Sequence, residues 1–321
     1  MNRTTTWIAL LAALAVVAAL FFFSGGTRTG ARAFDEEPAV HLVVDPERGE
    51  TRELKMEEYI QGVVGGEMGK LPPENGEERD WPHEAYAAQA ILARSFALSF
   101  LDEDGVVKIT ADVEEAQAYR PENITPAIRR AVEDTRGQVM IHRGDYVKAW
   151  FHSYSGGHTA TAKEGLNYQR EEPGFVKAVE LPENEYVPEE HRSWSARIPL
   201  ERVSEALAEL GVAVGNVTDV EILERGPSGR ATMLQVMGTS GRKEQVHAAD
   251  LRLALGAEEM KSTLLEELRI EGDALLMRGR GFGHGVGLSQ WDAYKMAQEG
   301  KSAEDILHAF FQEIEIERLW D

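Results

Sequence analysis

Residues 56–68, which read MEEYIQGVVGGEM, set the first element of the fold. Their apolar side chains recur at intervals of three and four residues, which is the period of one face of an α-helix. This face comprises Met56, Tyr59, Ile60, Val63 and Val64. The stretch therefore predicts a helix that packs against the protein core along this face.

Two more helices are predicted downstream. The second begins after Asp80, a suitable N-cap, with Pro82 in its first turn. One of its faces carries Ala85, Ala88, Leu92, Phe96 and Ser99. The third runs from Pro126 to Arg136, with Thr125 as its N-cap and Gly137 just beyond its end.

Strands are predicted once the apolar period changes to two, after Gly137. Arg143-Gly144-Asp145 form the turn of a hairpin, residues 160–195 are loop-like, and a helix is expected near 200–210. Further strands are expected at 217–224, 231–237, 243–247 and 265–277. Because helices come first and strands later, without β-α-β alternation, this order predicts an α+β fold.

The composition limits the class of protein. The chain has 321 residues, and its hydrophobic content of 43% suffices for a real core. It has no cysteine, which excludes a disulfide-stapled scaffold and thiolate metal ligands. A net charge of −21 argues against nucleic acid and anionic lipid as partners, so a neutral polymer such as a glycan fits better.

The N-terminus predicts export. Residues 7–23 are an unbroken run of apolar and small side chains, as in a signal peptide or a single membrane anchor. Ala31-Arg32-Ala33 resembles a signal-peptidase site but lies eight residues beyond Phe23, which favours an uncleaved anchor. We therefore expect a cytoplasmic leader at 1–5, an anchor or signal at 6–24, a linker at 25–38 and one extracytoplasmic domain at 39–321, in a single-pass protein of the cell membrane.

Glu67 is the candidate acid. It continues the apolar stripe of its helix, since Val63 lies four residues before it and Val64 three. Burial disfavours the charged carboxylate and raises its pKa, which would leave a protonated acid near neutral pH. The alternative is that Glu67 marks the helix end and turns to water.

Two glycine-containing loops carry further candidate residues. Residues 278–291 hold five glycines within nine positions, together with His284, Gln290 and Trp291. This run is either a shaped loop at a site or a turn into a helix near Ser289. Residues 151–159 leave a strand and include His152 and His158, which could share a zinc ion. The further ligands considered are His83, Glu164 and His284.

Arg94 and Ser95 lie on the second predicted helix. An arginine among small and apolar neighbours needs a partner, either a carboxylate or a substrate oxygen. The alternative is a surface arginine that extends from a half-buried helix.

These segments together resemble the stage II sporulation protein D (SpoIID/LytB) family. The resemblance rests on four ordered stretches, which are residues 56–68, residues 84–95, Phe151-His152-Ser153 with Ser155-Gly156-Gly157, and residues 281–290. It implies a SpoIID-like catalytic domain that acts as a lytic transglycosylase on peptidoglycan glycan strands. It also implies work beside a cell-wall amidase and a membrane partner during forespore engulfment.

The resemblance also assigns residues. It implies Glu67 as the catalytic acid and a groove lined by Arg94, Ser95, His152, Ser153, Ser155, Gly156, Gly157, His158, His284 and Gln290. Some family members bind zinc at the His-Ser loop through cysteines, whereas this chain has His158 at the thiolate position and no cysteine. We therefore expect no cofactor, with His152 and His158 as the candidates if zinc binds.

The implied mechanism uses one acid instead of two. Ordinary glycosidases place a second carboxylate opposite the first. A transglycosylase instead lets the C6 hydroxyl of muramic acid attack its own C1, so Glu67 would serve as acid and then as base. Two rival hypotheses are a metal-dependent hydrolase built on His83, His152, His158 and His284, and a non-catalytic wall-binding scaffold or stimulator of an amidase.

Overall fold

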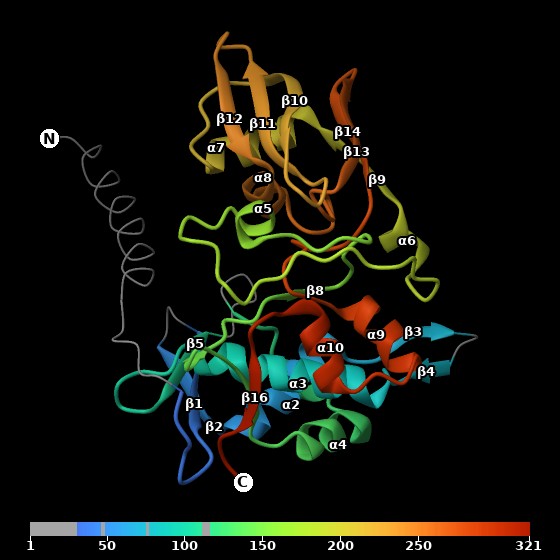
Figure 1. Cartoon of the computed structure of the whole chain (residues 1–321). Coiled ribbons are helices and arrows are strands. Elements are labelled where there is room, and N and C mark those ends of the chain that lie inside the picture. Colours follow the sequence, from blue (N-terminus) through green and yellow to red (C-terminus); the bar gives the residue numbers. More distant parts are fainter. Residues whose placement is uncertain (1–30, 46–48, 75–76, 111–115) are drawn as a thin grey trace, which may run out of the picture.

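The computed structural model describes residues 31–45, 49–74, 77–110 and 116–321, which form two large hydrophobic cores and one small cluster between 160 and 286. The core of the helical lobe is formed by residues between 40 and 187 and between 288 and 320. The core of the sheet lobe is formed by residues between 194 and 277. Figure 1 shows the two lobes one above the other, with loops, α5 (Ala162–Leu166) and β8 (Phe151–His152) between them.

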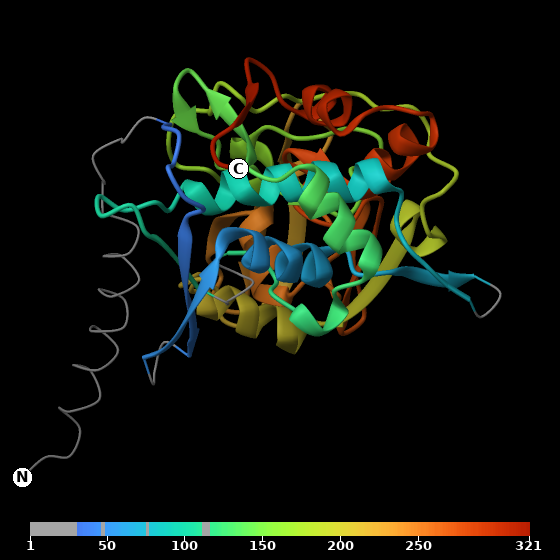
Figure 2. The same cartoon turned by 90° about the horizontal axis from the view of Figure 1, so that it is seen from below.

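Helix α3 (His83–Leu98) is the centre of the helical lobe. Every residue from Ala85 to Leu98 is buried, so the prediction of one buried face was too narrow. Six alanines in α3 let neighbouring elements approach from all sides. Figure 2 shows α3 between α2 (Met56–Glu67) and α4 (Pro126–Asp134) on one side and the C-terminal segment on the other.

Helices α2 and α4 follow the predictions closely. All five residues of the predicted apolar face of α2 have 0% exposure. The Thr125 Oγ1 accepts a hydrogen bond of 3.3 Å from the Ile128 N–H, as expected of an N-cap, although α4 ends at Asp134 instead of Arg136. The N-cap expected of Asp80 was wrong, because Pro82 precedes α3 and Asp80 accepts a hydrogen bond from Thr125 Oγ1 instead.

Small sheets flank these helices. Strand β1 (Ala39–Asp45) pairs antiparallel with β2 (Glu50–Lys55) and parallel with β5 (Val107–Thr110). The predicted hairpin is confirmed as β6 (Gln138–His142) and β7 (Asp145–Tyr146), with positive φ at Arg143 and Gly144. Strand β16 (Glu315–Arg318) pairs with the other edge of β6, and β3 (Leu71–Glu74) pairs with β4 (Glu77–Arg79).

The sheet lobe contains the strands predicted in the second half of the chain. They are β10 (Val217–Arg225), β11 (Ala231–Gly238), β12 (Lys243–His247), β13 (Leu265–Glu271) and β14 (Ala274–Gly279), with α7 (Leu200–Glu209) before them. The sequence reasoning missed β9 (Trp194–Pro199), which pairs with β14, and α8 (Ala248–Leu255). The region expected to be loop-like is interrupted by α5 and by α6 (Glu189–Arg192).

The α+β class is confirmed. Strands β1 and β2 precede α2 among the described residues, and helices continue into the second half of the chain, where one was expected near 200–210. After the sheet lobe, α9 (Gln290–Gln298) and α10 (Ala303–Phe310) return to the helical lobe and contact α3. The segment that forms the sheet lobe is thus inserted in the sequence between the two parts of the chain that form the core of the helical lobe.

The predicted leader at 1–5 and anchor at 6–24 lie outside the described residues. Among the residues that the structure does describe, none of the helices has the length and apolar character to span a bilayer. The second part of the expected linker is docked onto the helical lobe. The Phe34 N–H donates to the Leu319 carbonyl at 2.7 Å, and the Phe34 ring meets the Trp320 ring at a centroid distance of 5.9 Å.

Candidate active site

Glu67 is the last residue of α2 and is partly buried. Its Oε1 accepts a hydrogen bond of 2.5 Å from the backbone N–H of Ala118. Burial raises the pKa of the Glu67 carboxyl to about 7, and the Ala118 hydrogen bond works in the opposite direction. A carboxyl with this pKa is available as acid and as base near neutral pH.

Gln290, the first residue of α9, joins Glu67 to the centre of the lobe. Its Nε2 lies 3.5 Å from the Glu67 carbonyl oxygen and 3.4 Å from Oε1 of Gln89, so both hydrogen bonds are long. Gln89 lies on α3 with 0% exposure, and its own Nε2 has no partner among the described residues. The sequence reasoning missed Gln89, although a lone amide in an alanine-rich buried helix is a usable signal.

The two glycine-containing loops lie side by side. Strand β8 pairs parallel with β15 (Leu288–Ser289), which places Ser289 opposite His152. The Trp291 N–H donates to the Ser153 carbonyl at 3.0 Å. The structure therefore brings the His-Ser loop and the glycine-rich loop together at the start of α9, the helix whose first residue contacts α2. Trp291 itself is buried and packs against Trp81, with ring centroids 4.9 Å apart.

Ser155 has 0% exposure and holds these loops together. Its Oγ donates to Oδ2 of Asp292 at 2.7 Å, and its N–H donates to Oγ of Ser289 at 3.0 Å. Asp292 also accepts from Ser289 Oγ and from Nδ2 of Asn184, and burial raises its pKa. Sequence reasoning missed Asp292 and Asn184, which come from segments outside the expected loops.

Gly156 and Gly157 shape the same loop. Both have positive φ, at +74° and +98°. A Cβ at Gly156 would also lie 2.7 Å from a methyl group of Leu264. These glycines therefore determine the path of the loop, whereas Ser155 fixes it to α9.

His152 and His284 form a pair, with ring centroids 5.6 Å apart. Nδ1 of His152 must carry a proton, because it lies 3.1 Å from the Val286 carbonyl, which can only accept. Nδ1 of His284 accepts from the Val286 N–H at 3.0 Å. Burial, then the neighbouring charges of Arg252 and Arg230, lower the pKa of His284 to about 3, and burial also lowers the pKa of His152 well below 6.5. Both rings are therefore neutral at physiological pH.

The structure does not gather the zinc ligands considered from the sequence. His83 lies 3.3 Å from Asp134, and Glu164 accepts from the Ser228 N–H and hydroxyl. The backbone of His158 forms an isolated antiparallel β-bridge with that of Glu180. Nε2 of His152 is buried without a hydrogen-bond partner among the described residues. The neighbouring His284 ring cannot offer its Nδ1 to a shared metal, because that nitrogen accepts from the Val286 N–H. Over the described ranges no group of three or more histidine, aspartate or glutamate side chains is placed to hold a metal. These residues do not fit a zinc site.

Arg94 and Ser95 require a correction. The Arg94 side chain has 0% exposure and donates to Glu57, to Oγ1 of Thr135 and to the Val132 carbonyl. Ser95 is equally buried, and its Oγ accepts from the Met140 N–H at 2.7 Å. Side chains enclosed in this way cannot contact a substrate, so the prediction that they line the groove was wrong. Of the two partners considered for Arg94, the carboxylate is the one that it has.

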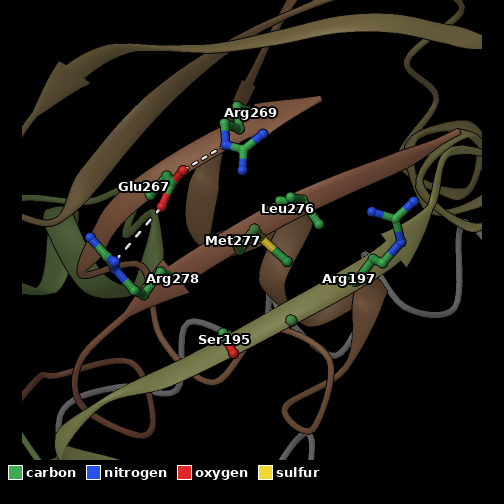
Figure 3. A pocket seen from close by; sticks show the side chains of 8 residues that line it. Ser195, Arg197, Glu267, Arg269, Leu276, Met277 and Arg278 are labelled. Carbon is green, nitrogen blue, oxygen red and sulfur yellow. Dashed lines mark hydrogen bonds and ion pairs between the residues drawn. The ribbon is translucent and has the colours of Figure 1, made fainter. Parts of the chain in front are cut away.

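Neither of two surface cavities has Glu67 in its lining. One, of about 450 Å³, lies on the sheet of β9, β14 and β13 (Figure 3). Its arginines are paired with glutamates, for example Arg269 and Arg278 with Glu267, and it shares no residue with the surroundings of Glu67. The other, of about 540 Å³, is lined by residues near the C-terminal end of α2, which are Lys70, Glu78, Asp80, Glu122, Asn123, Ile124, Thr125 and Pro126. Lys70, three residues after Glu67, is the lining residue of the second cavity that is closest to the candidate acid in the sequence.

Comparison with known proteins gives two family matches. Residues 45–142 match the model of SpoIID, described as stage II sporulation protein. Residues 166–287 match the model of a domain of unknown function, DUF8618. The first match contains Glu67 and Ala118, and the second contains most of the sheet lobe.

Three curated relatives extend these matches. The chain is 25% identical to stage II sporulation protein D of Bacillus subtilis, over 89% of this chain and 81% of that protein. It is 27% identical to stage II sporulation protein D of Bacillus amyloliquefaciens, over 82% of this chain and 74% of that protein. It is 22% identical to the amidase enhancer of Bacillus subtilis, over 78% of this chain but only 39% of that protein. The chain is therefore similar to stage II sporulation protein D over most of its length, and residues 45–142 match the SpoIID family model.

Proposed function

We propose that this protein is a lytic transglycosylase that cleaves the glycan strands of peptidoglycan, preferably strands stripped of their stem peptides. The observation that carries the proposal is the Glu67 carboxyl at the end of α2, whose pKa burial raises to about 7. Its similarity to the sporulation proteins supports a role in the cell wall during sporulation.

The proposed reaction has two proton transfers through one carboxyl. Glu67 donates its proton to the glycosidic oxygen as the bond from that oxygen to C1 of muramic acid breaks. The Glu67 carboxylate then accepts the C6 hydroxyl proton while O6 bonds to C1, which gives a 1,6-anhydro end and regenerates the acid. No water is consumed and no second carboxylate is required.

The proposed setting follows from the N-terminal sequence and the relatives. The apolar run at 7–23 anchors the chain in the cell membrane once, with the catalytic domain outside. The partners are peptidoglycan, a cell-wall amidase and a membrane protein of an engulfment complex. The similarity to an amidase enhancer supports the amidase as a neighbour in this pathway.

The test is Glu67→Gln, assayed on purified glycan strands with and without stem peptides. The amide keeps the shape but cannot transfer a proton at a useful rate, so turnover should fall by about a hundredfold to ten-thousandfold. Glu58→Gln, on the exposed side of the same helix, is the matched control.

Product analysis tests the reaction type. Mass spectrometry after borohydride treatment should show anhydromuramic ends, which are lighter than the reduced sugar from hydrolysis by one water and two hydrogens. Reducing ends alone, or a Glu67→Gln variant with normal turnover, would rule out the transglycosylase.

The second candidate is a non-catalytic protein that binds the wall and stimulates an amidase. The similarity to the amidase enhancer favours it. The Glu67→Gln variant separates the two functions, because a stimulator would retain its full effect on the amidase without the carboxyl. A variant that loses glycan cleavage yet still stimulates an amidase would show that both functions exist.

A further inference from the structure

Residues 116–120, named the strap here, lie across the face of α2 that ends at Glu67. The Ala118 N–H donates to Oε1 of Glu67 at 2.5 Å, and the Arg120 N–H donates to the Gly62 carbonyl at 3.0 Å. Between them, the Tyr119 ring stacks on the Tyr59 ring with centroids 5.7 Å apart and planes 8° apart. The strap is therefore fixed to α2 at three successive residues.

Glycines of α2 make this approach possible. A Cβ at Gly66 would lie 2.3 Å from the Ala118 carbonyl oxygen, and one at Gly62 would lie 2.2 Å from the Tyr119 ring. A Cβ at Gly65 would lie 3.0 Å from the Arg120 carbonyl oxygen. Glycine inside a helix makes the helix less stable than alanine would. Helix α2 therefore loses stability at Gly62, Gly65 and Gly66, and all three positions face the strap.

The strap and the helix beneath it contain buried polar side chains that lack hydrogen-bond partners among the described residues. Gln117 is 1% exposed, and neither of its side-chain polar atoms has a hydrogen-bond partner in the described part of the chain. The Tyr59 hydroxyl is also buried without a hydrogen-bond partner in that part of the chain. Unpaired buried polar groups are costly, which points to a role for this segment other than packing.

We propose that the strap is part of the active site and that the Ala118 N–H is the group that positions the proton of Glu67. This inference rests on the proposed function. An oxygen that accepts an N–H at 2.5 Å has no room for its own proton on that side, so the protonated acid carries its proton on Oε2. Oε2 is thus the oxygen that faces the glycosidic oxygen and, later, the C6 hydroxyl.

The same hydrogen bond sets the strength of the acid. It stabilises the carboxylate and so lowers the pKa of Glu67, whereas burial raises this pKa. The two effects together give a pKa of about 7. Without it, burial alone would hold the carboxyl protonated to higher pH. Glu67 would then remain an acid but would give up its proton less readily.

The test removes this one N–H from the full chain. Lactic acid replaces Ala118 through stop-codon suppression, so that an ester takes the place of the amide and the methyl side chain stays. The Glu67 carboxyl is followed by carbon NMR of isotopically labelled glutamate. Its pKa should rise by about one to two units, which is the worth of a hydrogen bond to a charged group.

Kinetics on glycan strands give the second readout. kcat should fall by roughly tenfold to a hundredfold, and the limb of the pH profile on the alkaline side should move upward with the pKa.

Lactic acid at Ala127 is the matched control, because that residue lies in the first turn of α4, where an amide has no partner within the helix. Gly66→Ala should shift the titration in the same direction by pushing the strap away.

An Ala118 ester with an unchanged Glu67 titration would overturn the inference, whatever the kinetics show. Failure of the proposed function is a different result, namely normal turnover in Glu67→Gln. In that case the NMR titration still decides whether the strap controls the carboxyl.

Discussion

Arg94 and Glu57 form a buried ion pair in which Nη2 and Oε2 are 2.6 Å apart. The Arg94 side chain has 0% exposure and that of Glu57 has 9%. Glu57 also accepts from the Gly137 N–H at 3.1 Å and from the indole N–H of Trp320 at 3.0 Å. One carboxylate therefore joins α2 and α3 to the end of α4 and to the C-terminus.

Arg94→Met should destabilise the domain because it leaves the Glu57 charge buried without its partner. The free energy of unfolding should fall by about 3–5 kcal/mol, measured by urea denaturation. Arg143→Met is the control, since Arg143 pairs with Glu313 at the surface and should change stability by less than about 1 kcal/mol. Equal effects of the two substitutions would contradict the structural role of Arg94.

Glu67→Gln should stabilise the domain above pH 7 and leave it unchanged near pH 4.5. The pKa of Glu67 is about 7 in the folded state and lower in the unfolded chain, so the folded state binds its proton more tightly. The stability from this proton is present at low pH and is lost as the pH rises through 7. Gln has no such dependence, so the variant should gain roughly 1–3 kcal/mol at pH 8. Denaturation at both pH values, with Glu58→Gln as control, measures the difference.

Gly287→Ala should damage the junction of β8 and β15. Gly287 has a φ of +71°, and a Cβ there would lie 2.0 Å from the Trp150 carbonyl oxygen. The strained φ costs about 1–2 kcal/mol and the overpacking adds about 1–3 kcal/mol. Gly272→Ala, with a φ of +65° and nothing within 4 Å, should show only the first cost. Thermal melting of the two variants separates the contributions.

A chain without residues 1–30 should be soluble and folded, because the removed part holds the apolar run. Removal of residues 1–38 should be less well tolerated. It deletes Phe34, which packs on Trp320, and Glu37, whose Oε1 accepts from the Glu57 N–H at 2.7 Å. The longer deletion should therefore melt at a lower temperature. Identical melting of the two chains would show that residues 31–38 contribute nothing.

Chelation should leave glycan cleavage unchanged, because an acid and an internal hydroxyl need no Lewis acid. The measurement is turnover before and after dialysis against a chelator, with metal content determined on the same samples. Stoichiometric zinc, together with loss of activity on its removal, would reverse this prediction and favour the histidine-based hydrolase.

Sequence patterns predicted the local elements well. The three-and-four spacing of Met56 to Val64 predicted α2, and the positive φ values at Arg143 and Gly144 occur in the turn expected there. The pattern also placed Glu67 at the edge of a buried stripe, where its pKa rises. These features depend on residues that are close in the chain, so they leave a periodic signal.

Partners distant in the chain could not be predicted. The pairing of β9 with β14 joins residues 194–199 to residues 274–279, and the Ala118 N–H meets a carboxylate 51 positions before it. Arg94 illustrates the limit, since the sequence left open a carboxylate, a substrate oxygen or solvent as its surroundings, and only the fold brings Glu57 to it.

The sequence by itself determined α2, α4, the hairpin of β6 and β7, the excess of negative charge and the acid at the end of α2, because local geometry and composition fix them. Only the tertiary structure decided which polar groups lie against that acid and which are consumed in holding the lobe together. Hydrogen bonds and ion pairs between distant segments follow from the packing of the whole chain, and no spacing within a segment records them.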